Sequence, residues 1–147
     1  MDTAKDTTTE LLVCTTCRPA GARRDEPAAG QLLWEAVQAV QAAQAVQAAN
    51  TAPQPGVRLR GMACLNSCSR ACTVALQAAG KHSYCFGDLQ PDADTAAHVL
   101  ACAALHAAST DGNLPRGERP ERLRSGILLR LPPLLLADAV VTGSLPG

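Results

Sequence analysis

The sequence predicts one α/β domain whose elements follow in the order β-α-β-β-β-α. Three observations lead to this prediction. Short apolar runs of strand length alternate with two long Ala-rich segments that have no internal Gly or Pro. Clusters of Pro, Gly and Asn separate these segments and mark turns. The chain of 147 residues is long enough for one domain with a core and too short for two.

The first three elements predict a parallel crossover. Residues 11–13 form an apolar run, typical of a buried strand, and the Ala-rich residues 31–50 favour a helix. Apolar residues recur every three positions in this helix, so its apolar stripe drifts around the axis. We therefore expect residues 31–43 to pack on the sheet and the rest to be exposed. The alternating residues 57–64 predict a strand, and strand, helix and strand joined by short loops imply a right-handed parallel connection.

The second half predicts a hairpin, a helix and a short extension. Residues 73–89 contain two strand-like runs around a Gly-Lys turn, typical of an antiparallel hairpin. Residues 91–109 open with Pro and Asp, as helices often do. The apolar face of this helix is expected to contain Ala97, Leu100, Ala101, Ala104 and Leu105. A short helix is expected near 118–125 and a short strand at 127–131.

This order of elements is the plan of a thioredoxin-like α/β sandwich with a helical or irregular C-terminal extension. We expect a flexible N-terminus at 1–8, the thioredoxin-like domain at 9–110 and an extension at 111–133 packed on that domain. A disordered tail is expected at 134–147, because fixed structure is not predicted beyond the proline pair.

Composition excludes several classes of partner. Lys plus Arg equal Asp plus Glu at 13 each, so charge favours neither nucleic acid nor an anionic membrane. Three aromatic residues are too few for a platform that stacks nucleic acid bases. The N-terminus lacks the pattern of a signal peptide, and residues 127–141 are interrupted well short of the ~20 apolar residues of a membrane span. We therefore expect a cytoplasmic protein with no nucleic-acid or membrane partner.

Seven cysteines in a reducing cytoplasm point to metal binding or thiol chemistry rather than disulfides. Cys14 and Cys17 follow the first predicted strand, and Cys64 and Cys68 follow the second. Parallel strands end at the same edge of a sheet, so these four thiols are expected to meet. Four thiolates suit tetrahedral zinc or a 2Fe-2S cluster. Cys72 is either a further ligand or a buried thiol at the start of a strand.

Other candidate residues favour structural roles. Cys85 and Cys102 are expected to be small core residues. The histidines lack the spacing of a metal site and are assigned to core or surface: His82, His98 and His106. Four arginines near the thiols either lower thiol pKa values or are solvated: Arg18, Arg23, Arg24 and Arg70. No phosphate-binding loop, dinucleotide motif or nucleophile motif is present, so no catalytic residue is assigned.

The stretch CLNSC resembles the C-L-G-x-C element of thioredoxin-like 2Fe-2S ferredoxins and of the related small subunit of NADH dehydrogenase. The resemblance implies that Cys64 and Cys68 are cluster ligands. Asn66 replaces the usual Gly, and Asn tolerates a left-handed backbone better than most residues. The first thiol pair is closer in sequence here than in those ferredoxins, which leaves the second ligand open between Cys17 and Cys72.

A wider resemblance covers residues 9–133 and includes VCTTCR, CLNSCSRACTVAL, GKHSYCFGDL and DGNLPRGERPERLRSGILLRLPP. These motifs resemble a bacterial family of small uncharacterised predicted metal-binding proteins of the thioredoxin-like 2Fe-2S ferredoxin group. The resemblance implies a metal-binding electron carrier whose partner is an unidentified redox or metal-accepting protein. Family members are often encoded near cobalamin and cobalt genes, so the alternative is a zinc- or cobalt-delivery protein.

A third hypothesis is a thiol-disulfide oxidoreductase that uses Cys14 and Cys17. Thioredoxins carry this motif at a helix N-terminus, whereas about a dozen loop residues separate Cys17 from the predicted helix here. The sequence therefore favours the metal centre over this hypothesis.

Overall fold

The computed structural model describes residues 8–18, 21, 23, 25–48, 56–65 and 70–134, with the side chains of 45–48 left out. The helices and strands are β1 (Thr9–Cys14), α1 (Ala29–Ala48), β2 (Val57–Met62), β3 (Val74–Gln77), β4 (Ser83–Phe86), α2 (Ala93–Ala108) and β5 (Ile127–Leu131). Two 3-10 turns lie between α2 and β5, namely η2 (Arg116–Glu118) and η3 (Glu121–Leu123). The predicted α/β fold and its order β-α-β-β-β-α are confirmed.

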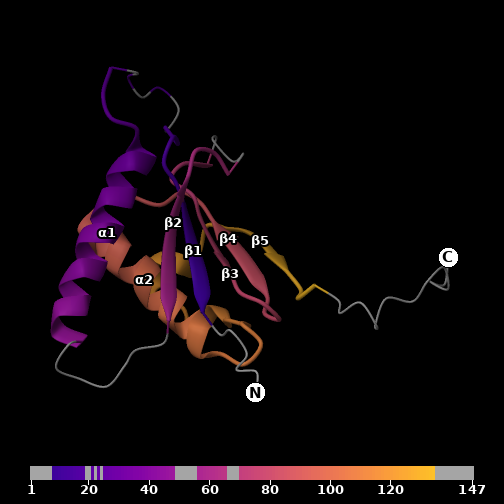
Figure 1. Cartoon of the computed structure of the whole chain (residues 1–147). Coiled ribbons are helices and arrows are strands. Elements are labelled where there is room, and N and C mark those ends of the chain that lie inside the picture. The colour runs from indigo at the N-terminus through magenta and orange to yellow at the C-terminus, as the bar shows by residue number, and fades with distance from the viewer. Residues whose placement is uncertain are drawn as a thin grey trace, which may run out of the picture.

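The described strands form one sheet in the order β2-β1-β3-β4-β5 (Figure 1). β1 pairs in parallel with β2, from Thr9 opposite Val57 to Cys14 opposite Met62, as the predicted crossover requires. β1 also pairs antiparallel with β3, and β3 with β4 forms the predicted hairpin. β1 is therefore an inner strand whose C-terminal end has a neighbour on each side.

The core lies between the sheet and the two helices. α1 and α2 pack against each other and both contact β1. Leu11 and Val13 on β1 and Tyr84 and Phe86 on β4 belong to this core, and Leu12 and Cys14 on β1 are buried as well. In α1, Leu33 and Val37 are fully buried as expected, but the exposed part already begins at residue 42, so residues 42 and 43 do not pack on the sheet as predicted.

The buried face of α2 differs from the predicted one. Leu105, expected in the core, is 40% exposed, and Ala101 is exposed. The buried residues are Thr95, Ala96, Val99, Leu100, Cys102, Ala103, His106 and Ala107. Alanine makes every side of this helix weakly apolar, so tertiary packing rather than the pattern selects the face. The helix start is as expected, since the Asp92 carboxylate accepts a hydrogen bond from the Thr95 backbone at 2.8 Å.

The C-terminal extension is less helical than predicted. The helix expected near 118–125 is wrong, and η2 and η3 stand in its place. Pro120 lies between the two turns and disfavours helical geometry at the residue before it. The strand expected at 127–131 is confirmed as β5. The flexible N-terminus predicted at 1–8 and the tail predicted at 134–147 lie, apart from Thr8 and Leu134, outside the described residues.

Neither helix in the described part of the chain combines the length and the apolar character needed to cross a bilayer.

A buried imidazole ties α2 to the strands at the end of the sheet away from Cys14. His106 is fully buried, with Nδ1 2.6 Å from the Thr9 hydroxyl and Nε2 2.6 Å from the His82 carbonyl oxygen. The neutral ring with its proton on Nε2 satisfies both contacts, since it donates to the carbonyl and accepts from the hydroxyl. Burial lowers the pKa of His106, with a smaller effect from the Lys81 ammonium.

We expect this imidazole to make stability depend on pH. Above about pH 6.5 the ring is neutral in both states, and below it the unfolded ring takes up a proton before the folded one. The free energy of unfolding should therefore fall as the pH is lowered from about 7.5 to about 5.5 in urea titrations. His106→Gln should remove most of this fall, whereas His98→Gln should keep it. A His106→Gln protein with the wild-type pH dependence would show that another group is responsible.

Candidate functional site

Two buried thiols meet at the C-terminal end of β1. Cys14 is the last residue of the strand, and Cys17 follows a short turn. The Cys17 thiol donates a hydrogen bond to the Cys14 sulfur, with 2.7 Å between the two Sγ atoms, and both residues are fully buried. Thr73, just before β3, brings its hydroxyl within 3.4 Å of the Cys17 sulfur. The pair is thus enclosed from the β3 side.

The loop that follows β2 lies against the same turn. The Thr15 backbone donates to the Met62 carbonyl at 2.8 Å, and the Thr16 hydroxyl donates to the Ala63 carbonyl. The Leu65 backbone N–H donates to the Cys14 thiol. Cys64, which is exposed, therefore belongs to a loop that lies beside the thiol pair. The parallel pairing of β1 with β2 causes this arrangement, as the sequence predicts.

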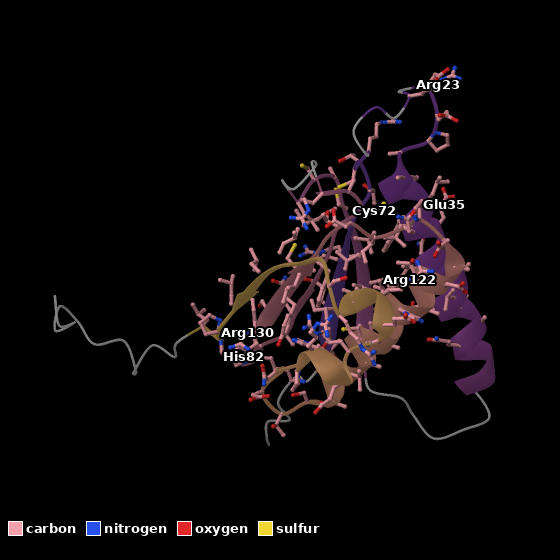
Figure 2. The ribbon with its side chains drawn as sticks, turned by 180° about the vertical axis from the view of Figure 1, so that it is seen from behind. Arg23, Glu35, Cys72, His82, Arg122 and Arg130 are labelled. Carbon is pink, nitrogen blue, oxygen red and sulfur yellow. The ribbon has the colours of Figure 1, made fainter. Side chains whose placement is uncertain are left out.

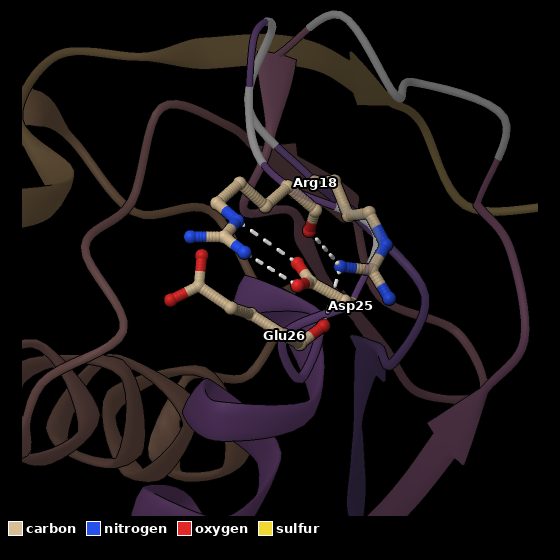
Figure 3. Close-up of polar contacts among 4 residues, drawn as sticks. Arg18, Asp25 and Glu26 are labelled. Carbon is tan, nitrogen blue, oxygen red and sulfur yellow. Dashed lines mark hydrogen bonds and ion pairs between the residues drawn. The ribbon is translucent and has the colours of Figure 1, made fainter.

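The N-terminus of α1 packs on the backbone of the thiol pair. The Gly30 N–H donates to the Cys17 carbonyl at 3.0 Å, and a Cβ atom added to Gly30 would lie 2.0 Å from the Cys14 carbonyl oxygen. Arg18 holds the two ends of the loop between Cys17 and α1 together, because its guanidinium donates to the Glu26 carbonyl at 2.6 Å (Figure 3). The helix start is therefore adjacent to the thiols in space although it is distant in sequence.

The two thiols share a proton unequally. Burial acts to raise the pKa of Cys14, yet hydrogen bonds from Cys17, from the Leu65 backbone and from Thr16 hold that pKa below its usual value. Burial, followed by the hydrogen bond to Cys14, raises the pKa of Cys17 to about 12. The arrangement favours a Cys14 thiolate that accepts the proton of a Cys17 thiol.

The other cysteines occupy different surroundings. Cys72 is buried in the core cluster, and burial, with a smaller effect from the charge of Cys14, raises its pKa to about 11. Cys102 is fully buried, as expected, whereas Cys85, also expected in the core, is only half-buried on β4. Cys68 lies outside the described residues. Within the residues that are described, no three Cys, His, Asp or Glu side chains are placed to share a metal ion.

The arginines near the thiols bind oxygen atoms. Arg70 forms a two-pronged ion pair with Asp88, with Nε 3.0 Å from each carboxylate oxygen. Arg23 pairs with Asp25 at the tip of the loop, far from Cys72 in Figure 2. Together with the carbonyl contacts of Arg18, these partners support structural roles for the described arginines; Arg24 lies outside the described residues.

Sequence reasoning missed three residues that shape the site. The sequence assigns Gly30 to the loop before the helix predicted at 31–50, whereas it lies in the first turn of α1, where a glycine allows close backbone approach. Thr73 directly follows Cys72, and Thr16 lies between Cys14 and Cys17. The hydroxyls of both threonines lie near the sulfurs of the thiol pair. Their role depends on the pairing of β1 with β3 and on the turn after β1.

The fold and the site together define an α/β protein with a buried, proton-sharing thiol pair at the end of an inner strand of its sheet. Over residues 11–133 the chain matches the family described as "Protein of unknown function (DUF1636)", and it belongs to that family. The comparison with curated proteins found no match, and the comparison with solved structures found none. The family description names no activity, so the function has to be argued from the site.

Proposed function

We propose that this protein binds a metal centre through Cys14, Cys17, Cys64 and Cys68 and acts as a 2Fe-2S carrier of single electrons of the thioredoxin-like ferredoxin type. The observation that carries the proposal is the buried pair of sulfurs, 2.7 Å apart, beside the loop of a third cysteine. Thiolates are the ligands that iron-sulfur clusters use. The partner would be a redox protein or a protein that accepts the metal.

The chemistry of the donor set fits such a centre. Metal ligands must be deprotonated, and the hydrogen bonds around Cys14 already favour its thiolate. Binding would release the proton of Cys17. The two sulfurs would also have to separate, because sulfurs on one tetrahedral zinc are roughly 3.7 Å apart for bonds of about 2.3 Å. The exposed loop of Cys64 can supply the third sulfur with little disturbance of the core.

The chain's own groups would tune the centre. Bound here, a 2Fe-2S cluster would accept and donate one electron. The Leu65 N–H and the Thr73 hydroxyl lie at the sulfurs, and hydrogen bonds to sulfur change a cluster's reduction potential. Burial of the first two sulfurs keeps water away from that side of the site.

A zinc- or cobalt-delivery protein is the second candidate. The observation that favours it is the contrast between exposed Cys64 and buried Cys14 and Cys17. An exposed ligand can exchange with an incoming protein thiol, so a metal held here could be handed on. A thiol-disulfide oxidoreductase has less support, because both sulfurs of its pair are shielded from a protein substrate. The sequence argued against this third candidate because a loop separates Cys17 from the helix. That argument no longer holds, since the start of α1 lies beside Cys17 in space.

The test is metal analysis of anaerobically purified protein. We expect absorption bands in the visible range and about two irons and two sulfides per chain. Cys64→Ser should abolish or strongly alter the spectrum, because it removes a ligand from an exposed position without disturbing the core. Cys102→Ala, which changes a thiol in α2, should leave the spectrum unchanged.

Three outcomes separate the candidates. An unchanged spectrum in Cys64→Ser would overturn the ligand assignment. Protein without iron and sulfide that holds about one metal ion per chain, either colourless zinc or coloured cobalt, would favour metal delivery. Protein without metal after anaerobic purification, which also fails to take up iron and sulfide, would contradict both.

A further inference from the structure

We infer that Cys14 and Cys17 close into a disulfide in the metal-free protein, and that this disulfide blocks metal loading until it is reduced. The inference rests on the proposed function, because it concerns the regulation of the same site. The structural basis is the direct contact between the two sulfurs, with no other atom between them and with the backbone on either side already held in place.

The distance between the sulfurs favours closure. They are 2.7 Å apart, and a disulfide bond is about 2.05 Å long, so they need to approach by about 0.7 Å. The backbone is fixed by the Gly30 N–H on the Cys17 carbonyl and by the Thr15 N–H on the Met62 carbonyl. Little conformational freedom remains to be lost when the bond forms. Metal binding requires the opposite movement, so the two states exclude each other.

Burial determines which oxidant can act. Both sulfurs are fully buried, and the Leu65 N–H, next to exposed Cys64, donates to the Cys14 sulfur. A folded protein therefore cannot reach them, which leaves a small disulfide such as oxidised glutathione as the oxidant. The neighbouring Thr73 hydroxyl and the α1 backbone remain in place and keep Cys17 beside its partner.

The exchange balances in two steps. The Cys14 sulfur, which accepts the Cys17 hydrogen bond, attacks one sulfur of the small disulfide and releases the other half as a thiolate. Cys17 then loses its proton, its sulfur attacks the Cys14 sulfur of the mixed disulfide, and the second half leaves. The protein pair loses two electrons and the small disulfide gains them as two thiols. The product has no thiolate at either position, so two ligands are lost together.

The experiment uses full-length protein stripped of metal by a chelator. It is equilibrated with mixtures of reduced and oxidised glutathione, blocked with an alkylating reagent and mapped by mass spectrometry. Binding of Co²⁺ is then followed by its thiolate absorption before and after oxidation. We expect a Cys14–Cys17 crosslink, a loss of Co²⁺ affinity of about tenfold or more, and full recovery on reduction. Cys102→Ala should behave as wild type, and Cys17→Ser should form no internal crosslink.

Two results would overturn the inference. One is a crosslink that forms mainly between other cysteines, and the other is oxidised protein that binds Co²⁺ as tightly as reduced protein. Failure of the proposed function has a different signature. In that case the reduced protein itself binds neither Co²⁺ nor iron, so the disulfide has no metal loading to control. The mass-spectrometric map still reports whether the disulfide forms.

Discussion

Gly30→Ala is expected to destabilise the protein by about 2–3 kcal/mol and to prevent normal metal loading. The added Cβ would lie 2.0 Å from the Cys14 carbonyl oxygen and 3.0 Å from the Cys17 backbone nitrogen, so helix or turn must move. An alanine in a helix is ordinarily favourable by about 1 kcal/mol relative to glycine. A net loss would therefore show that close approach outweighs helix propensity here. Urea unfolding measures the stability, and metal content measures the site.

The matched control is Gly117→Ala in η2. No atom lies within 4 Å of a Cβ added there, so a change within about 0.5 kcal/mol is expected. If Gly30→Ala were as stable as this control and loaded metal normally, the result would contradict the close packing of α1 on the backbone of the thiol pair.

Phe86→Ala is expected to cost about 3–5 kcal/mol of unfolding free energy. The ring is fully buried and stacks on Tyr84, with 5.8 Å between ring centroids. The Arg119 guanidinium also lies over the Phe86 ring, 5.7 Å from the ring centroid. Arg119 is 6% exposed, and its Nε and Nη1 have no hydrogen-bond partner in the described part of the chain. Truncation would create a cavity and also remove the ring that stabilises this charge.

Leu129→Ala is the control for Phe86→Ala. Leu129 lies on β5 and is 46% exposed, so its truncation should cost less than about 1 kcal/mol. Urea unfolding of both variants compares them directly. A Phe86→Ala loss no larger than that of Leu129→Ala would mean that Phe86 is not the core residue described here.

The order of elements could be predicted because local signals agreed with it. Alternating apolar residues mark β2 and β4, and a strand-helix-strand connection with short loops favours the parallel pairing of β1 and β2. The buried side of α2 could not be predicted, since a helix made largely of alanine has no dominant face. The prediction of a helix after α2 was also wrong. Pro120 disfavours helical geometry at the residue before it, so two 3-10 turns, η2 and η3, form on either side of it.

The same reasoning explains what was predicted at the site. The meeting of Cys14 and Cys17 with the loop of Cys64 follows from parallel strands that end at one edge. The contact of α1 with these thiols does not follow from sequence, because a loop of many residues can return to where it started. Arg18 fastens that loop through backbone carbonyls, which carry no sequence signal at the accepting residues. The position of Cys68 remains a prediction.

The inner place of β1 in the sheet also has a consequence for synthesis on the ribosome. β1 leaves the ribosome first, but both strands that flank it come later, and the second of them ends at Gln77. At about 5–20 residues per second, the roughly 60 residues from Cys17 to Gln77 take about 3–12 seconds to make. For that interval the two thiols lack the strand that later encloses them from the β3 side. A metal ion or oxidant that reaches the nascent chain meets them in a C-x-x-C segment that β3 does not yet shield.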